Sequence, residues 1–412
     1  MTASAAVEGG PASVTERAFP ALDGARALAA TAVLLHHVAF WTGHYTPDLT
    51  GRIFSRLDIG VAIFFVLSGF LLSRPLFLAA CEGRPGPRTA AYLWRRALRI
   101  LPAYWLTVVA ALLLLPQNDG AGPADWLRHL TLTQVYGTGH LREGLSHTWS
   151  LSTEVAFYLV LPVAGAGLVR LARHRPDRPA GVLLALALAA LGGFAFLAWH
   201  WAARPFPSSG MDLWLPSYAG WFAAGMALAV LSVSDPAWRP VRLAAELGAS
   251  LPTCWAAAGA LFWIANSPVA GPMGLLEPTA AQAVLKSALY LAVAFLLVLP
   301  LVFGTPGHGW ARRALASRAG HFLGELSYGL FLIHVVVLAG GFAVLDLVQF
   351  TGSVFWVGLA VWLLSTALAA ALYVLVERPL RRWRTVVPES RVPGSPASSD
   401  EATAVTAASA SS

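Results

Sequence analysis

The chain has 412 residues, of which 57% are hydrophobic and 12% are charged, and its mean hydropathy is positive. This balance excludes an ordinary soluble domain and predicts an integral membrane protein. The two cysteines, Cys81 and Cys254, form no CxxC pair or zinc spacing, so we expect neither a disulfide nor a metal site. The net charge of +7 does not indicate a nucleic-acid partner, because the arginines stand between apolar segments without interleaved aromatic residues.

The two ends of the chain have compositions that cannot form a packed core. Residues 1–20 are mostly small and lack the basic start, apolar centre and cleavage site of a signal peptide. Residues 386–412 are rich in Ser, Ala and Pro. We therefore predict a disordered cytosolic leader, a membrane domain over 21–385 and a disordered cytosolic tail, with no further folded domain.

Between these ends, stretches of about 20 apolar residues predict membrane-spanning helices. The fold class expected is thus all-α, a polytopic membrane helix bundle with about ten spans. The predicted spans are Leu22–Trp41, Ile59–Leu78, Leu98–Leu115, Thr148–Leu171, Gly181–His200, Leu213–Leu231, Leu247–Ala265, Ala283–Phe303, Phe322–Leu345 and Val354–Val376.

The arginines predict the orientation of these spans, since basic residues in short links remain cytosolic. Alternate links are rich in arginine, and the intervening links contain fewer arginines offset by carboxylates. The arginine-rich links include Arg84, Arg88, Arg95 and Arg96, then Arg170, Arg173, Arg175 and Arg178, then Arg239 and Arg242, then Arg312, Arg313 and Arg318, and last Arg378, Arg381, Arg382 and Arg384. Both termini are therefore expected in the cytosol of a cell-membrane protein.

The first span, Leu22 to Phe40, contains polar groups that are costly inside a bilayer, namely Asp23, Arg26, His36 and His37. A rotation of about 100° per residue places Arg26 and His37 within roughly 20° of one helix face, while His36 points about 80° away. The same eleven residues span roughly 16 Å along the axis. One face of this helix is thus expected to connect a cation at the inner surface with an imidazole inside the membrane.

Three other spans place polar groups at similar depths. Glu154 lies roughly 10 Å below the outer end of its helix, and His334 lies roughly 18 Å from the inner end of another. Ser68 and Gly69 fall near the middle of the membrane, where Gly69 allows another backbone or a ligand to approach closely. His37 is therefore expected among these groups, although depth alone does not establish contact.

At the inner surface, "WRRALRILPAYW" places Arg95 and Arg96 within one helical turn of Arg99. Fixed guanidinium groups bind phosphates through bidentate hydrogen bonds, whereas the structural alternative is a positive-inside anchor.

Structural alternatives also exist for the other polar groups. Arg26 can extend to the lipid headgroups, the histidine pair can fill a polar gap, and Glu154 or His334 can make an interhelical hydrogen bond. The tryptophans mostly suit the interfacial belt, and only Trp149 is considered for a weak functional role.

Several of these stretches together resemble one family. "LDGARALAATAVLLHHV" is similar to the opening Arg-x10-His signature of the acyltransferase-3 family of membrane O-acyltransferases, with Arg26 and His37 in the signature positions. The resemblance covers Leu22 to Trp383, and Ala25 and Ala27 depart from the family's usual Leu and Gly. The later blocks occur in the usual order: "GVAIFFVLSGFLLSR", "RRALRILPAYW", "HTWSLSTEVAFYLVLP", "LSYGLFLIHVVV" and "VERPLRRW".

This resemblance implies transfer of an acyl group, often acetyl, from acyl-CoA to a hydroxyl of a sugar-containing acceptor, with no metal. The acceptor classes are envelope glycans or lipid-linked sugars, and small glycosylated natural products such as macrolides. In this interpretation His37 is the general base, Glu154 orients its imidazole, and the donor phosphates bind to arginines. The donor-binding candidates are Arg26, Arg95, Arg96 and Arg99, and further substrate-site candidates are His36, Ser68, Trp149, Tyr328 and His334.

Two other functions remain open from the sequence. Polar residues inside a ten-helix bundle also suit a transporter or exporter of a small anion or metabolite, although no internal repeat is evident. A structural partner in an envelope-assembly complex is the third alternative. The sequence indicates neither the acceptor, the acyl chain length nor the oligomeric state.

Overall fold

The computed structural model describes residues 19–137, 140–203, 210–274, 276–305 and 307–388, and these contain helices and no strand. The all-helical membrane fold is therefore confirmed, and each of the ten predicted segments contains a helix. The predicted leader and tail lie almost wholly outside the described residues, so their disorder and the domain limits stay predictions.

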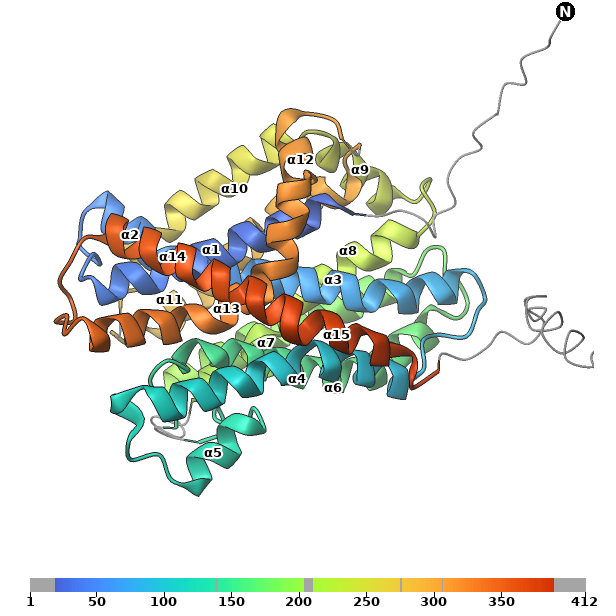
Figure 1. The fold of residues 1–412 in the computed structure, drawn as a ribbon. Coiled ribbons are helices and arrows are strands. Elements are labelled where there is room, and N and C mark those ends of the chain that lie inside the picture. The colour runs from blue at the N-terminus through green and yellow to red at the C-terminus, as the bar shows by residue number, and fades with distance from the viewer. Residues whose placement is uncertain (1–18, 138–139, 204–209, 275, 306, 389–412) are drawn as a thin grey trace, which may run out of the picture.

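The long helices share one principal direction, and the shorter ones connect or cap them (Figure 1). In chain order they are α1 (Ala21–Trp41), α2 (Leu49–Arg56), α3 (Ile59–Cys81), α4 (Thr89–Leu114), α5 (Pro123–Leu130), α6 (Trp149–Ala172), α7 (Ala180–Ala203), α8 (Leu215–Val233), α9 (Arg239–Ala249), α10 (Leu251–Ala265), α11 (Ala280–Phe303), α12 (Trp310–Leu315), α13 (Arg318–Val344), α14 (Val354–Leu372) and α15 (Arg378–Leu380). A π-helical turn, η6 (Tyr373–Glu377), follows α14, and the 3-10 segment η7 (Arg381–Thr385) follows α15.

Side chains in the preceding loops determine where several helices begin. Ser317 accepts a hydrogen bond from the Gly320 amide at the start of α13. At the start of α11, Thr279 and Gln282 form a reciprocal capping box. Such caps satisfy amide groups that have no partner within the helix.

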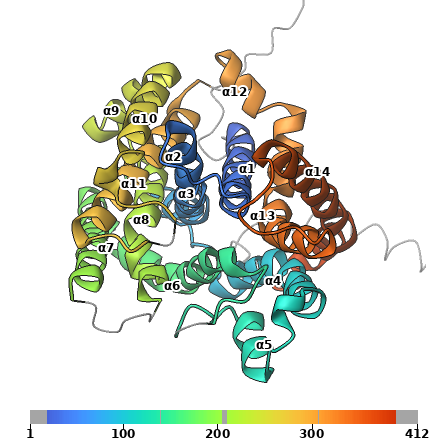
Figure 2. The same ribbon diagram turned by 90° about the vertical axis from the view of Figure 1, so that its left-hand side faces the viewer.

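Among the described residues, eight helical segments are long and apolar enough to cross a membrane, and the bent pair of α9 and α10 raises the number to nine. The first predicted span, α1, is outside this count. Its Asp23, Arg26 and two histidines lower its hydropathy, yet it packs between α3 and α13 inside the bundle. Figure 2, a view from one end, shows α1 surrounded by other helices.

The seventh predicted span, Leu247–Ala265, is not one continuous helix. The chain bends by 87° between α9 and α10, and the break lies at Ser250, which has a non-helical backbone. Pro252 in the first turn of α10 cannot donate an amide hydrogen bond back into α9. The 15 residues of α10 extend about 22 Å, less than the hydrocarbon thickness of about 30 Å.

A close backbone approach joins α3 and α8. A methyl group added to Gly69 would meet the Phe222 carbonyl oxygen, and one added to Gly225 would meet the Val66 carbonyl oxygen. These glycines face each other across the two helices, as small residues do in membrane helix packing. The close approach that the sequence predicted at Gly69 is therefore confirmed, and the approaching group is backbone.

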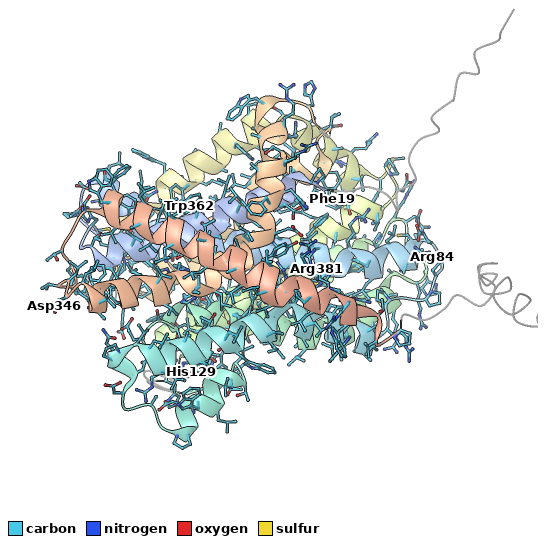
Figure 3. The ribbon with its side chains drawn as sticks, viewed as in Figure 1. Phe19, Arg84, His129, Asp346, Trp362 and Arg381 are labelled. Atoms are coloured by element: carbon cyan, nitrogen blue, oxygen red, sulfur yellow. The ribbon has the colours of Figure 1, made fainter. Side chains whose placement is uncertain are left out.

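The arginine-rich end of the bundle comprises the starts of α1, α4 and α13, the ends of α3 and α6, and η7. Trp94 Nε1 donates to the Trp383 carbonyl oxygen at 2.8 Å, which joins α4 to η7. His321 Nδ1 lies 2.8 Å from Asp23 Oδ2, which joins α13 to α1. Both ends of the described chain thus lie at this end of the bundle, and Figure 3 shows Arg84 there and Asp346 at the opposite end.

We predict that Gly225→Ala lowers the stability of the purified protein by about 1 to 3 kcal/mol, because the new methyl group separates α3 from α8. The measurement is the thermal unfolding midpoint in detergent, followed by tryptophan fluorescence. Gly167→Ala in α6 is the matched control, since a methyl group there meets nothing within 4 Å. Equal midpoints for the two variants would contradict the close packing.

Candidate active site

A cavity of about 390 Å³ opens at the arginine-rich end of the bundle, between α1, α3, α4, α6, α13 and η7. We call it the first cavity. Seven of the residues singled out in the sequence line it: Arg26, Ser68, Arg95, Arg96, Arg99, Glu154 and Tyr328. Arg381 and Arg384 of η7 also line it, and Figure 3 shows Arg381 in the interior between the helices. Six arginines from three parts of the chain, α1, α4 and η7, therefore surround one space.

Two carboxylates neutralise part of this positive charge. Glu377, whose side chain is 5% exposed, forms an ion pair with Arg99. Glu325 accepts hydrogen bonds from Arg381 Nη2 and from the Tyr373 hydroxyl, both at 2.8 Å. Arg99 is paired because α14 ends in the π-helical turn that brings Glu377 to α4. Its binding of a donor phosphate stays a prediction.

Arg26 differs from Arg99 because no hydrogen bond or ion pair links its guanidinium to another residue in the described part of the chain. Its side chain is partly buried and faces the first cavity. A guanidinium inside an apolar bundle requires an anionic partner or water. The Arg26 guanidinium is therefore available to an anionic ligand in the first cavity.

Glu154 has a different partner from the one expected. Its carboxylate accepts a hydrogen bond from the Ser68 hydroxyl, and no hydrogen bond joins it to His37. The structure therefore does not show the expected contact between Glu154 and the His37 imidazole, and the role of Glu154 stays a prediction. The reason is rotational: α6 presents Glu154 to α3, whereas His37 faces α13. Ser68 and Glu154 together supply a polar spot on the otherwise apolar inner wall of the first cavity.

His37 contacts a second histidine that the sequence also singled out. His37 Nδ1 lies 3.1 Å from His334 Nε2 and 2.9 Å from the Val33 carbonyl oxygen. His334 Nδ1 faces the Phe331 carbonyl oxygen at 2.6 Å, so Nδ1 carries the hydrogen and Nε2 accepts. His37 Nδ1 likewise carries its hydrogen, since it faces a carbonyl. In the neutral ring, His37 Nε2 then keeps a lone pair that no described residue uses.

A third imidazole, His147, completes this histidine cluster and was missed in the sequence analysis. Its ring centre lies 4.8 Å from that of His334 and 6.0 Å from that of His37. His147 Nε2 donates to the Leu332 carbonyl oxygen at 3.1 Å, whereas its Nδ1 is buried without a partner among the described residues. Its place two residues before Trp149 was visible in the sequence, but only the fold shows that it faces His37.

The histidine cluster and the first cavity lie on opposite sides of one aromatic layer. Phe331 lines the cavity, and its ring centre lies 5.2 Å from that of His147 and 5.9 Å from that of His334. Phe64 also lines the cavity and packs edge-on against Phe331. The histidines therefore do not line the first cavity themselves, and one layer of rings separates them from it.

His36 and Trp149 lie outside the first cavity as well. The His36 ring faces away from the cavity, and its Nδ1 lies 2.8 Å from the Tyr45 hydroxyl. Trp149 stacks on Tyr218 at 5.1 Å and contacts Phe65, which lines the cavity. Tyr328 lines the cavity, but its hydroxyl donates to the Ile100 carbonyl oxygen at 2.8 Å.

The fold and the site define a multi-pass membrane protein with a cationic cavity beside a cluster of imidazoles. A family model described as an acyltransferase domain matches residues 19–377. The chain therefore belongs to the acyltransferase-3 family, as the motifs predicted, and the reaction class of this family is acyl transfer. No solved structure matches the chain.

Relatives in this family differ in how much of the chain they match. Nodulation protein 10 of Rhizobium leguminosarum bv. viciae is 26% identical, over 88% of this chain and 93% of its own length. Peptidoglycan O-acetyltransferase OatA of Listeria monocytogenes is 29% identical, over 35% of this chain and 23% of its own length. Acyltransferase MdmB of Streptomyces mycarofaciens is 29% identical, over 35% of this chain and 38% of its own length. The chain thus spans less than half the length of the last two relatives.

We predict that Glu377→Gln destabilises the protein by about 1 to 3 kcal/mol, because it leaves the Arg99 charge uncompensated inside the bundle. The double variant Arg99→Gln with Glu377→Gln should recover part of this loss. Thermal unfolding in detergent measures both effects.

Glu82→Gln is the matched control for this ion pair. Glu82 pairs with Arg84 at the surface, with side chains 31% and 48% exposed, so its loss should cost less than about 0.5 kcal/mol. An equal effect of Glu82→Gln and Glu377→Gln would show that the buried pair has no special role.

Proposed function

We propose that this chain is a membrane O-acyltransferase that moves a short acyl group, such as acetyl, from acyl-CoA to a hydroxyl of a sugar-containing acceptor. One observation supports this most directly: α1 presents an unpaired arginine to the first cavity and, on the side facing α13, an imidazole with an unused Nε2. An anionic carrier held at the arginine can therefore deliver its acyl group toward a base on the same helix.

The donor binds at the arginine-rich end in this proposal. The phosphates are bound by four arginines of the first cavity: Arg26, Arg95, Arg96 and Arg99. Arg99 also keeps its ion pair with Glu377. The pantetheine arm, which is neutral and flexible, runs between apolar walls to the polar spot of Ser68 and Glu154. Because acyl-CoA is cytosolic, this end faces the cytosol, in agreement with the positive-inside rule.

The chemical step uses His37 as the general base. Its Nε2 takes the proton of the acceptor hydroxyl as the hydroxyl oxygen attacks the thioester carbonyl carbon. The new C–O bond forms, the C–S bond breaks, and the imidazolium returns the proton to the departing thiolate. His334 Nε2 accepts from His37 Nδ1–H and thereby orients the ring, which is the role first assigned to Glu154.

The acyl group must pass Phe331 to reach His37, so this step includes rotation of the Phe331 side chain. On the far side of that ring, the buried Nδ1 of His147 has no partner in the described structure. A buried hydrogen-bond acceptor atom that receives no hydrogen bond costs about 1 to 3 kcal/mol. A hydroxyl of the bound sugar-containing substrate donates a hydrogen bond to His147 Nδ1. This bond holds the hydroxyl beside His37.

The acceptor belongs to one of the two classes that the family resemblance implies. The Listeria relative is named as acting on peptidoglycan, which favours an envelope glycan or lipid-linked sugar. A small glycosylated natural product such as a macrolide is the other option. Incubation with labelled acetyl-CoA and a host extract, followed by mass spectrometry of the labelled product, distinguishes them.

We predict that His37→Ala reduces acyl transfer at least about 100-fold while acyl-CoA binding is retained, because a positioned base contributes about 10² to 10⁴ in rate. Transfer from labelled acetyl-CoA into the host extract measures the first effect, and calorimetry measures binding. His44→Ala is the control, since the His44 side chain contacts Thr42 in the loop after α1 and does not line the first cavity. Wild-type turnover in His37→Ala would remove His37 from the mechanism.

We predict that Arg26→Ala raises the KM for acetyl-CoA about tenfold, with a smaller effect on the KM for the acceptor, because a hydrogen bond to a charged group is lost. Steady-state kinetics with each substrate varied in turn measures this. Arg313→Ala is the control: this arginine is exposed in α12 at the same end and does not line the first cavity. An unchanged donor KM in Arg26→Ala would contradict the donor site.

A further inference from the structure

A second cavity, of about 770 Å³, lies beside the first at the arginine-rich end. It is bounded by the last turns of α3, the first turns of α4 and the last turns of α6. Four residues line both cavities: Leu71, Leu72, Arg95 and Arg96. The two spaces therefore meet at a pair of arginines, and a ligand bound there can extend into both.

The wall of the second cavity combines apolar surface with positive charge. Its apolar part includes Pro75 and Leu76 of α3 and Leu161, Pro162 and Val169 of α6. Its five arginines are Arg84, Arg95, Arg96, Arg170 and Arg173, and no carboxylate is among its lining residues. Such a wall suits an amphiphilic anion.

Not all five arginines are equally available to a ligand. Arg84 forms an ion pair with Glu82, whereas no ion pair of the described residues involves Arg170 or Arg173. These two lie three residues apart at the end of α6, so their side chains lie on one face of the helix. Two guanidinium groups on one face can bind one phosphate together.

Two buried polar atoms at this site also lack partners. The Tyr92 hydroxyl and Arg96 Nε are inaccessible to solvent and form no hydrogen bond within the described residues. Both residues line the second cavity. Unpaired buried donors are rare and costly, so the hydrogen-bonding capacity of these two residues is unused beside the second cavity.

We infer that the second cavity is the subsite for the adenosine 3′,5′-bisphosphate end of acyl-CoA, with the 3′-phosphate on Arg170 and Arg173. This inference rests on the proposed function. The diphosphate then lies where the cavities meet, in contact with Arg95 and Arg96 and, on the side of the first cavity, with Arg26 and Arg99. The pantetheine arm extends from there into the first cavity. The adenine ring packs on the apolar wall of α3 and α6.

The sizes of the two cavities support this division of the donor. The first cavity, at about 390 Å³, is near the lower limit of ordinary ligand pockets, which hold roughly 300 to 1,000 Å³. Acyl-CoA contains a nucleotide, three phosphate groups and a long arm, and it needs more space than this. The second cavity supplies that space on the side where the free positive charge lies.

The test compares binding of coenzyme A and 3′-dephospho-coenzyme A to the full-length protein in nanodiscs of neutral lipid, measured by calorimetry. The wild-type protein should bind coenzyme A about tenfold more tightly than 3′-dephospho-coenzyme A, because the latter lacks the 3′-phosphate and its contact with the arginines. Arg170→Gln with Arg173→Gln should abolish this preference and leave the affinity for 3′-dephospho-coenzyme A unchanged. Arg175→Gln should keep the preference, since Arg175 is exposed in the same link but does not line the cavity.

Several outcomes would overturn the subsite. The first is equal affinity of the wild-type protein for coenzyme A and 3′-dephospho-coenzyme A. The second is an equal loss of affinity for both ligands in the double variant. Thermal stabilisation of the wild-type protein but not of the double variant by phosphatidylglycerol, with equal wild-type affinity for the two coenzymes, would assign the cavity to a lipid instead. Failure of the proposed function has a separate signature: a 3′-phosphate preference without any acyl transfer in the host extract leaves the subsite intact and removes the reaction.

Discussion

The contact between α1 and α13 is the constraint on which the site depends. A methyl group at Gly324 would meet the Asp23 backbone, so only glycine allows the two helices to approach this closely. His321 of α13 contacts Asp23 of α1 at the arginine-rich end, and His334 of α13 contacts His37 of α1 deeper in the bundle. Because the helices touch at these points, Arg26 faces the first cavity and the His37 imidazole is held in one orientation. A membrane helix with this many polar groups is stable only when a neighbour receives them.

Charge balance is the second condition for a cationic cavity in a membrane protein. Arginines without counterions repel one another and lose hydration, and this cost falls when carboxylates stand nearby. Glu325 and Glu377 supply such carboxylates from α13 and from the π-helical turn after α14, yet Arg26 remains unpaired. The cavity thus combines arginines that are structurally neutralised with an arginine that is available to a ligand. Anion binding then needs no rearrangement of the bundle.

The sequence predicted the helical segments and the residue types of the site because hydropathy and helical spacing are local properties. It placed Arg26 and His37 on one face of α1; in the structure Arg26 lines the first cavity, and His37 contacts His334 of α13. It did not predict the partners of Glu154 or Arg99, since these depend on the rotation of one helix against another. The break at Ser250 was also missed, because an apolar stretch with a proline in its first turn has the composition of an ordinary span.

The aromatic layer at Phe331 bears on the choice between transfer and transport. In the described structure, the first cavity ends at Phe64 and Phe331, and the histidine cluster begins behind them. A transporter must move a whole solute past such a layer, together with its charge. A transferase needs only a neutral acyl group to cross, while the phosphates of its carrier stay on the arginines. The separation of cations from imidazoles by an apolar layer therefore matches the division of coenzyme A thioesters into an anionic head and a neutral, reactive end.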